Sequence, residues 1–405
     1  MIHCFCKKYK CLFLADTFFL EADMKVAVLG FGTVGVGVYE MLAAAKGLEA
    51  GPVLVRPGKE DKPFKLSSIE AIVNDPEVGA VAEVMGGVEP AFSYACAALR
   101  AGKHFVTSNK ALVAAKGVEL NRLARENGVA FLFSAACGGG VPFLHNLALA
   151  RESDVILSLG GILNGTTNFM LDAMQRLGLD YADVLADAQR LGYAEADPTA
   201  DVSGLDALRK IMLACAVAYD LLPKEGLLNE GIESITASDV AHFQARGYTC
   251  RLVVSGGRAA DGGVFAYVEP VLLRAGAPEC SVLENYNMAR YEGQCAGPIV
   301  LMGQGAGRYP TASAVLRDLS GILRGERYMF SAACAEGAAD NSGSVHGYYV
   351  RLPAALAGEF PAEALEQDGD IARLITAPMS VKAMHETARR LRAQGAALFF
   401  AAIKQ

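Results

Sequence analysis

The chain has 405 residues, of which 52% are hydrophobic and 20% are charged, and its formal net charge is −7. This composition is typical of a globular protein with two or three domains and excludes an intrinsically disordered chain. The acidic balance, without any basic stripe, argues against a nucleic-acid partner, because phosphate backbones are bound by clustered lysine and arginine. No apolar run is long enough to span a bilayer, so no membrane association is expected.

Ten cysteines and six histidines are spread over the chain without the paired spacing of a structural metal site. Most of the cysteines, such as Cys96, Cys215 and Cys250, stand singly in apolar segments, where a free thiol packs as a small hydrophobic residue. Reduced thiols and a cytoplasmic location are therefore expected. Residues 1–23 differ in character from the rest of the chain, and we interpret them as an upstream extension, with a functional tail as the alternative.

Residues 24–134 alternate short apolar runs with helical stretches such as Pro90–Ala101 and Ala114–Asn127. Alternation of this kind predicts βαβ units, a parallel sheet and a Rossmann-type domain in an α/β protein. We expect segments near 300–325 to complete this domain. The predicted strands are Lys25–Leu29, Val53–Val55, Val81–Met85, Phe105–Thr107 and Ala130–Phe133.

A glycine-rich segment, Cys137–Pro142, marks the start of a second α/β domain, expected over residues 135–300. The segment Gly303–Leu319 is interpreted as a glycine-rich loop followed by a helix. A last unit, residues 346–405, is expected to open with a strand at Tyr348–Leu352 and to close with a strand pair around a helix. Strands of the second domain are predicted at Val155–Leu163, Arg251–Ser255, Phe265–Val271 and Ala289–Tyr291.

The first predicted strand runs directly into a GxGxxG turn that opens a helix. In such turns the glycines allow a tight bend, close approach of the backbone to a pyrophosphate and close helix–strand packing. The helix N-terminus then offers N–H groups to the phosphates. GxGxxG alone is a weak signal, but its strand–turn–helix context favours dinucleotide binding over a plain tight turn. The turn consists of Gly30, Phe31, Gly32, Thr33, Val34 and Gly35.

The residue after the second strand bears on the choice between NAD and NADP. An NAD site usually has a carboxylate there, about 20 residues beyond the glycine turn, to bind the ribose. This chain has Arg56 instead, with Lys59 close by. A guanidinium suits a 2′-phosphate, so we expect NADP(H), with NAD as the alternative cofactor. An ordinary solvated loop arginine is the other interpretation of Arg56.

The segment Leu205–Tyr219 has the periodicity of a helix. Asp206 and Lys210 stand four residues apart on a stripe whose further members, Leu213 and Val217, are apolar. The opposite stripe is apolar throughout, so both sides of this helix are expected to be buried. Most such pairs are exposed ion pairs. A buried lysine beside a carboxylate is instead a candidate acid/base group, because burial readily changes the pKa of lysine.

Further charged residues precede this helix. Glu195, Asp197 and Asp201 lie in the loop GYAEADPTADVSG, and carboxylates of this kind suit a substrate with an amino group. Lys110 follows the strand Phe105–Thr107, at the end of a parallel sheet where such sheets bind ligands. A lysine in an exposed loop would be the ordinary interpretation without that placement.

Seven motifs, in this order, resemble those of homoserine dehydrogenases from Met24 to about Leu319: VAVLGFGTVG, EVMGGVEP, VTSNKALVA, GGGVP, GILNGTTNF, GYAEADPTADVSGLDALRK and GAGRYPTASAV. The longer ones are rarely shared by other families. The resemblance implies interconversion of L-homoserine and L-aspartate 4-semialdehyde with NAD(P)H, on the route to threonine, isoleucine and methionine.

The resemblance also implies roles for single residues. Lys210 would be the general acid/base and Lys110 its partner near cofactor and substrate. Glu195 and Asp206 would hold the amino group of homoserine, with Asp201 in support. The glycine turn and Arg56 would bind the cofactor, with help from Gly86 and Gly303.

The family further binds a monovalent cation such as Na⁺, largely through backbone carbonyls. Here Cys137, Gly139 and Val141 would supply those carbonyls. Ser134 stands where the family usually has a glutamate, so one anionic ligand is missing.

Two larger features follow from the resemblance as well. The second domain would pair two subunits into a homodimer, and the tail would be an ACT-like regulatory segment. The middle of that tail, GEFPAEALEQDGD, is short and acidic, so we expect a shrunken segment with weak or absent threonine feedback.

Two alternative functions remain open. One is a thiol-dependent aldehyde dehydrogenase with Cys137 as nucleophile and His145 as its base. The other is a non-catalytic NADP-binding sensor, which the retention of both lysines and their carboxylates opposes.

Overall fold

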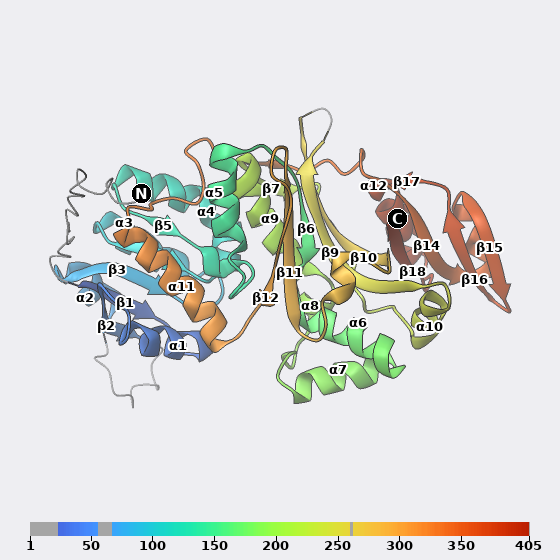
Figure 1. Cartoon of the computed structure of the whole chain (residues 1–405), viewed down its shortest axis with the longest axis horizontal. Helices are drawn as coiled ribbons and strands as arrows, with labels where there is room; N and C mark the ends of the chain where they lie inside the picture. The colour runs from blue at the N-terminus through green and yellow to red at the C-terminus, as the bar shows by residue number, and fades with distance from the viewer. Residues whose placement is uncertain (1–22, 56–66, 260–261, 405) are drawn as a thin grey trace, which may run out of the picture.

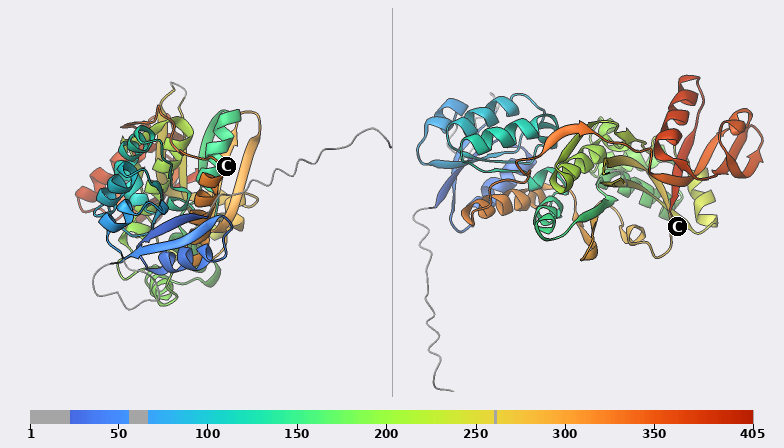
Figure 2. Two further views of the ribbon diagram at one scale, coloured as in Figure 1. Left: turned by 90° about the vertical axis from the view of Figure 1, so that its left-hand side faces the viewer. Right: turned by 90° about the horizontal axis from the view of Figure 1, so that it is seen from above.

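The computed structural model describes residues 23–55, 67–259 and 262–404. Arg56, Lys59 and residues 1–22 of the predicted extension lie outside the described residues. The first domain and the C-terminal unit lie at opposite ends of the molecule, with the second domain between them (Figures 1 and 2). Among the described residues, no helix combines the length and apolar character needed to cross a membrane.

The first domain is a five-stranded parallel sheet. Its strands are β1 (Met24–Leu29), β2 (Leu48–Leu54), β3 (Val78–Glu83), β4 (His104–Thr107) and β5 (Phe131–Leu132), in the order β2-β1-β3-β4-β5. The sheet forms because its strands are apolar on both faces: Val26, Ala27, Val28 and Leu29 of β1 are all fully buried. The parallel sheet expected from the alternating pattern is confirmed.

Helices cover this sheet, and one of them comes from much later in the chain. They are α1 (Thr33–Leu42), α2 (Ile69–Asn74), α3 (Ala91–Arg100), α4 (Lys110–Glu126) and α11 (Arg308–Leu323). A Cβ on Gly37 of α1 would lie 3.2 Å from the Cβ of Ala312, so α11 packs closely on α1. Phe131 also bridges to Tyr328 beyond α11. The chain therefore returns to the first sheet after forming the second.

The second domain contains a larger, mixed sheet. Its strands are β6 (Ile156–Ile162), β9 (Tyr248–Arg258), β10 (Val264–Arg274), β11 (Tyr286–Gly293) and β12 (Gly297–Gln304), in the order β12-β11-β6-β9-β10. Short β8 (Leu228–Asn229) pairs with β10, while β7 (Leu221–Glu225) pairs with β13 (Ala335–Ala338). Strand β12, in the segment leading to the predicted glycine-rich loop, is not predicted from the sequence.

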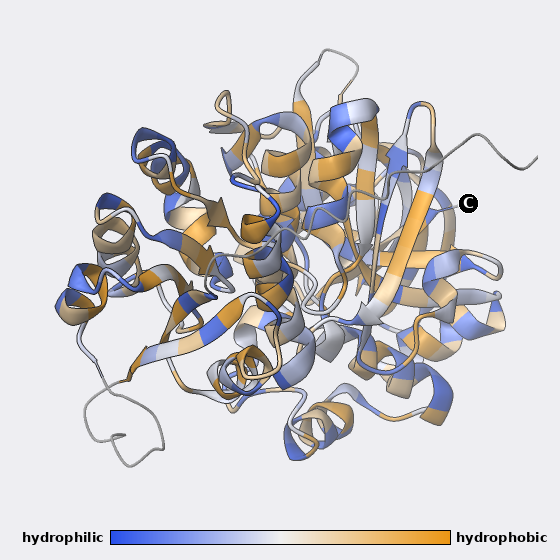
Figure 3. Ribbon diagram, turned by 60° about the vertical axis from the view of Figure 1, so that its left-hand side comes forward, coloured by the Kyte–Doolittle hydropathy of each residue, from blue (hydrophilic) through white to orange (hydrophobic). Residues whose placement is uncertain are grey.

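Six helices accompany this sheet: α5 (Phe143–Ser153), α6 (Gly165–Leu177), α7 (Tyr181–Arg190), α8 (Thr199–Val202), α9 (Leu205–Tyr219) and α10 (Ala237–Ala245). Helix α9 has the predicted bounds, and all of its residues except Leu205 and Arg209 are buried. Hydrophobic residues line the strands and the helix sides that face them (Figure 3). The expectation that both sides of α9 are buried is therefore confirmed, including the positions of its one aspartate and one lysine.

The C-terminal unit extends the second sheet. It consists of β14 (Val345–Pro353), β15 (Ala362–Asp368), β16 (Ile371–Thr376), β17 (Met379–Ser380), α12 (Val381–Ala393) and β18 (Phe399–Lys404). Strand β18 pairs in parallel with β10 and antiparallel with β14, and the order continues β18-β14-β16-β15. The short acidic segment forms β15, after a 3-10 turn at Ala354–Glu359. No strand is predicted there from the sequence, because every residue of β15 is exposed and the strand forms by backbone pairing with β16.

Candidate active site

The glycine turn lies between β1 and α1 and opens on a cavity of about 640 Å³. Gly30 has a φ of +99°, a conformation that favours glycine. A Cβ on Gly35 would lie 2.1 Å from the carbonyl oxygen of Gly30, so this glycine permits close helix–strand packing. Gly32, at the N-cap of α1, faces open space and leaves the backbone accessible. Gly86 lines the same cavity. Thr33 does not line it and is the first residue of α1.

A second cavity of about 570 Å³ lies beside the N-terminal end of α9. It brings together residues from both domains: Val34 of the first, and Asp201, Asp206 and Lys210 of the second. Gly303 lies within β12 and lines neither cavity, while Gly305 and Gly307 just beyond it line this one. The remaining candidates that line it are Lys110, Glu195 and Gly139.

Asp206 is the centre of the polar network in this cavity. Its two carboxylate oxygens bind different ammonium groups, with Lys210 Nζ at 2.8 Å and Lys110 Nζ at 2.9 Å. Lys210 also donates to the carbonyl oxygen of Leu163 at the end of β6. Asp206 and Lys210 are buried, whereas the Lys110 side chain is 36% exposed. The pair predicted from helix spacing therefore exists, and Lys110 joins it from the first domain.

Asn164 holds two of the carboxylates in place. Its side-chain nitrogen donates to Asp201 at 2.7 Å and to Asp206 at 2.9 Å. Its side-chain oxygen accepts from the backbone N–H of Thr167 and so caps helix α6. One amide thus fixes both the helix start and the two acidic groups. Among the described residues, Glu195 differs from these carboxylates, because it is exposed on its loop and forms no side-chain hydrogen bond or ion pair.

The charges of this network influence one another. Burial disfavours the ionised form of Asp206, but the ammonium groups of Lys210 and Lys110 outweigh it and hold its pKa well below the ordinary value. Burial likewise opposes the charge on Lys210, yet the Asp206 carboxylate raises its pKa above the ordinary value. Burial raises the pKa of Asp201. Lys210 is therefore held as an ammonium that can donate a proton into the cavity.

The thiol alternative does not fit this geometry. Cys137 is fully buried, and burial raises the pKa of its thiol to about 12, so the reactive thiolate is not formed near neutral pH. Its sulfur contacts the carbonyl oxygen of Lys210 at 3.8 Å. His145, the proposed base, faces Glu326 at 3.7 Å instead.

Ser134, in the segment after β5, is hydrogen-bonded to helix α11. The Ser134 hydroxyl and backbone N–H both donate to the carboxylate of Asp318 on α11, the N–H at 2.8 Å. Both residues are buried, and burial raises the pKa of Asp318 to about 7. The side chain of Ser134 is therefore already hydrogen-bonded to a residue of α11.

Two polar residues of the cavity were assigned no role from the sequence. Asn164 lies in the motif GILNGTTNF, where a polar turn directly follows a buried strand, and that position was the available signal. Asn287 of β11 is 1% exposed, and neither its side-chain nitrogen nor its oxygen has a hydrogen-bond partner among the described residues. No periodicity marks Asn287, because the space for its amide is left by Gly305, where a Cβ would lie 2.0 Å from the side-chain nitrogen.

A glycine-rich turn on a parallel sheet, next to a cavity lined by buried lysine and carboxylate groups, defines an NAD(P)-dependent dehydrogenase. Comparison with known proteins makes the assignment specific. Residues 30–134 match the model of the homoserine dehydrogenase NAD binding domain, and residues 142–320 match that of homoserine dehydrogenase. The chain belongs to the homoserine dehydrogenase family, and its activity is that of this NAD(P)-dependent oxidoreductase, EC 1.1.1.3.

Individual relatives agree with this result. The chain is 39% identical over 319 residues to homoserine dehydrogenase of Synechocystis, covering 74% of this chain and 73% of the relative. It is 40% identical over 318 residues to the Corynebacterium glutamicum enzyme, covering 74% and 72%. A homoserine dehydrogenase structure from Thiobacillus denitrificans, 30% identical, matches 95% of this chain and 99% of its own with a TM-score of 0.86. A hyperthermophilic archaeal homoserine dehydrogenase in complex with NADPH, 26% identical, matches 75% and 98% with a TM-score of 0.64.

Proposed function

We propose that Lys210 is the general acid/base of the homoserine dehydrogenase reaction and that Lys110 assists it. The supporting observation is the buried network in which both ammonium groups share Asp206. In the direction of semialdehyde reduction, the Lys210 ammonium would donate a proton to the carbonyl oxygen of the substrate. In the reverse direction, neutral Lys210 would remove the proton from the hydroxyl group of homoserine.

Glu195 and Asp206 would both attract the amino group of the substrate, but in different ways. Asp206 already binds two lysines and Asn164, so its carboxylate has little remaining capacity to accept further hydrogen bonds. Glu195 is exposed at the cavity and has its carboxylate oxygens available. We infer that Glu195 binds the substrate ammonium directly, while Asp206 and Asp201 position the lysines and Asn164. The unpartnered amide of Asn287 would bind the substrate's carboxylate group.

A pH dependence follows from the raised pKa of Lys210. Reduction needs the ammonium form, so kcat/KM for the semialdehyde should stay constant from neutral to mildly alkaline pH and fall only as Lys210 loses its proton. Oxidation needs the neutral amine, so kcat/KM for homoserine should rise with pH over the same range. Rate profiles measured in both directions with one buffer series test this. A homoserine profile that falls as pH rises would contradict it.

The nucleotide cavity fits a dinucleotide, because the open backbone at Gly32 sits at the N-terminus of α1. Gly30, Gly32, Thr33, Val34, Gly35 and Gly86 would hold the cofactor, which supplies or accepts the hydride when bound. We propose NADP(H) over NAD, because Arg56 in the sequence suits a 2′-phosphate. Comparing kcat/KM for the two cofactors in wild type and Arg56→Ala tests this; equal loss with both would refute a role in 2′-phosphate binding.

The proposed monovalent cation, such as Na⁺, would bind the carbonyl oxygens of Cys137, Gly139 and Val141. The donor groups fit it poorly: Ser134 supplies no carboxylate, and one lone pair of the Val141 carbonyl oxygen already accepts from Phe143 N–H at 2.8 Å. We therefore derive no catalytic step through a cation. Activity compared in sodium, potassium and tetramethylammonium salts at one ionic strength tests the site directly.

We further propose a homodimer formed through the second sheet. The support is its edge strand β12, whose Val300 and Met302 are 44% and 59% exposed. The free state of the seven described cysteines is consistent with a cytoplasmic location.

The C-terminal unit is proposed to be ACT-like. Its main elements follow one another as β14, β15, β16, α12 and β18, and its strands have the order β18-β14-β16-β15 in the sheet. Only a 3-10 turn stands where a first helix would be, so threonine feedback is expected to be weak or absent. Inhibition by millimolar threonine would contradict this.

The decisive test of the mechanism is NADPH oxidation with L-aspartate 4-semialdehyde. Lys210→Ala should lower the rate by about 10²–10⁴-fold. Lys224→Ala is a matched control, because Lys224 donates to the backbone carbonyl of Ala114 at 2.6 Å and lines neither cavity. Near-normal turnover of a folded Lys210→Ala enzyme would overturn the assignment.

A further inference from the structure

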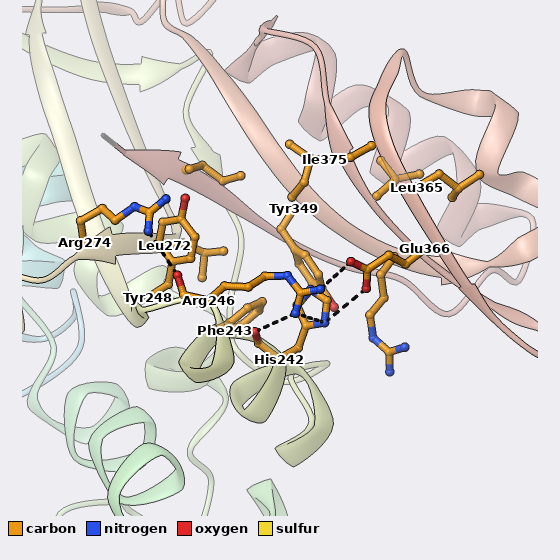
Figure 4. Close-up of a pocket in the computed structure, with 14 residues that line it drawn as sticks. His242, Phe243, Arg246, Tyr248, Leu272, Arg274, Tyr349, Leu365, Glu366 and Ile375 are labelled. Atoms are coloured by element: carbon orange, nitrogen blue, oxygen red, sulfur yellow. Dashed lines mark hydrogen bonds and ion pairs between the residues drawn. The ribbon is translucent and has the colours of Figure 1, made fainter.

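A third cavity, of about 440 Å³, lies between the second domain and the C-terminal unit, away from the catalytic cavity. Helix α10 and strands β9 and β10 form one side, and strands β14, β15 and β16 form the other (Figure 4). Its volume is within the range of small-molecule sites. Most of its wall is apolar, with contributions from Phe243, Leu272, Tyr349, Leu365 and Ile375.

The charged groups around this cavity are unbalanced. Arg246, Arg274 and Arg373 line it, against a single carboxylate, Glu366. Glu366 is already bound by Arg246 and lies 4.0 Å from His242. Arg373 is only 14% exposed, and its guanidinium lies 3.9 Å from the carboxylate of Asp368, which does not line the cavity. Its Nε is buried without a hydrogen-bond partner among the described residues. The cavity therefore holds an excess of positive charge within an apolar surface.

Arg274 is the cation best placed to receive a ligand. Its guanidinium stacks on the ring of Tyr248 at 4.2 Å and donates to the carbonyl oxygen of Arg246 at 3.2 Å. Within the part of the chain that the structure describes, no carboxylate lies within ion-pair distance of it. A stacked guanidinium is preorganised for two parallel hydrogen bonds to a carboxylate.

We propose that this cavity is an effector site for a small organic carboxylate with an apolar body. The carboxylate binds Arg274, and the apolar body packs against Leu272, Tyr349 and Ile375. The ligand class follows from complementarity: an anionic head offsets the excess of arginine, and an apolar body replaces water on the cavity wall.

The structure also links this cavity to the active site. Gln244 of α10, next to the cavity, donates to the carbonyl oxygen of Gln175 on α6 at 2.6 Å. Helix α6 begins at its N-cap Asn164, whose side chain binds Asp201 and Asp206. A ligand that moves α10 would therefore act on the helix that positions these carboxylates. This effector role rests on the proposed catalytic use of Asp206, whereas binding itself does not.

The test uses the full chain, with saturating NADPH and homoserine present so that the dehydrogenase site is filled. Calorimetry measures binding of 3-phenylpropionate, of the neutral 3-phenylpropan-1-ol and of L-threonine. We expect the carboxylate to bind at least about tenfold more tightly than the alcohol, because a charge-assisted hydrogen bond is lost in the latter. Threonine, which lacks an apolar body, should not compete.

Three variants locate the site. Arg274→Gln should weaken 3-phenylpropionate binding about tenfold or more, and Ile375→Trp should abolish it by filling the cavity. Arg258→Gln is the matched control, since Arg258 also stacks on a tyrosine, Tyr219, outside this cavity, and should bind as wild type does. Equal binding of carboxylate and alcohol, unchanged binding by Arg274→Gln, or no binding to wild type would each overturn the site.

The effector role has a separate readout. The KM for homoserine is measured at increasing 3-phenylpropionate concentration in wild type and in Gln244→Ala. A shift in KM that is smaller in Gln244→Ala, with binding retained, supports the route through α10 and α6. Binding that leaves both kcat and KM unchanged would overturn the effector role, and it would do so whether or not Lys210 is the acid/base.

Discussion

Replacing Asn164 by alanine removes four hydrogen bonds at once, two of them with Thr167 through its backbone N–H and its hydroxyl group. The side chain caps α6 through Thr167, and its nitrogen binds Asp201 and Asp206. Loss of an N-cap costs about 1 kcal/mol of stability, and each hydrogen bond to a charged group contributes about 1.5–3 kcal/mol. Because two lysines still hold Asp206, only part of that energy should appear in catalysis. We expect kcat/KM to fall about 10–100-fold, which corresponds to ~1.4–2.7 kcal/mol.

The control variants separate capping from positioning. Ser68→Ala removes the N-cap of α2, far from the catalytic cavity, and should reduce stability without reducing kcat/KM. Asn164→Asp keeps a capping oxygen but places a third carboxylate beside Asp201 and Asp206, so it should retain the cap while repulsion among the carboxylates lowers activity at least as far as in Asn164→Ala.

Steady-state NADPH oxidation with L-aspartate 4-semialdehyde provides the kinetic measurement, and urea unfolding the stability. The reasoning is refuted if Asn164→Ala keeps kcat/KM within about twofold of wild type, or if Asn164→Asp is fully active. Either result would mean that the carboxylates are positioned without this amide.

Three further predictions concern buried groups. Asn287→Ala should raise the KM for homoserine more than it lowers kcat, because its unpartnered amide is expected to bind substrate; an unchanged KM would contradict this. Asp318 has a folded-state pKa of about 7, above its ordinary 3.8, so its contribution to stability is present at low pH and is lost as pH rises from about 4 to about 7. Unfolding of wild type and Asp318→Asn across this range should show wild type losing stability relative to the variant; parallel curves would refute the raised pKa. Because burial raises the pKa of its thiol, Cys137→Ala should leave most activity intact, and iodoacetamide should not inactivate the native enzyme. Inactivation by iodoacetamide that Cys137→Ala prevents would instead support the thiol mechanism.

Periodicity predicts the parts of the fold that depend on local pattern. Helix α9 is predicted residue for residue, because its apolar stripes repeat at helical spacing and its buried Asp206 and Lys210 interrupt only one of them. The glycine turn is also recognisable, since strand, turn and helix follow one another directly. Both features are encoded within short stretches of sequence.

The features that the sequence does not predict depend on contacts between distant segments. Strand β12 is a strand because it pairs with β11, and β15 because it pairs with β16. Ser134 is bound by Asp318, which stands on a helix 184 positions away. Asn164 stands in a visible motif, but the two carboxylates that its amide binds come from later elements. Such pairings between distant segments leave no periodic pattern in the sequence.

Finally, the way the chain passes between the two sheets limits how they can move. Residues after β5 and residues after β12 cross from one domain to the other side by side: Gly140 N–H donates to the Gln304 carbonyl at 3.0 Å, and a Cβ on Gly139 would lie 2.5 Å from the Gly305 carbonyl oxygen. The two crossings are bonded to each other, and a third connection follows α11, where Ala335 N–H donates to the Asp220 carbonyl at 3.1 Å. Sliding of one domain past the other would break these hydrogen bonds. Both crossings border the catalytic cavity. Because Lys110 already lies 2.9 Å from Asp206 across this boundary, any separation of the two domains there would break an ion pair of the catalytic cavity.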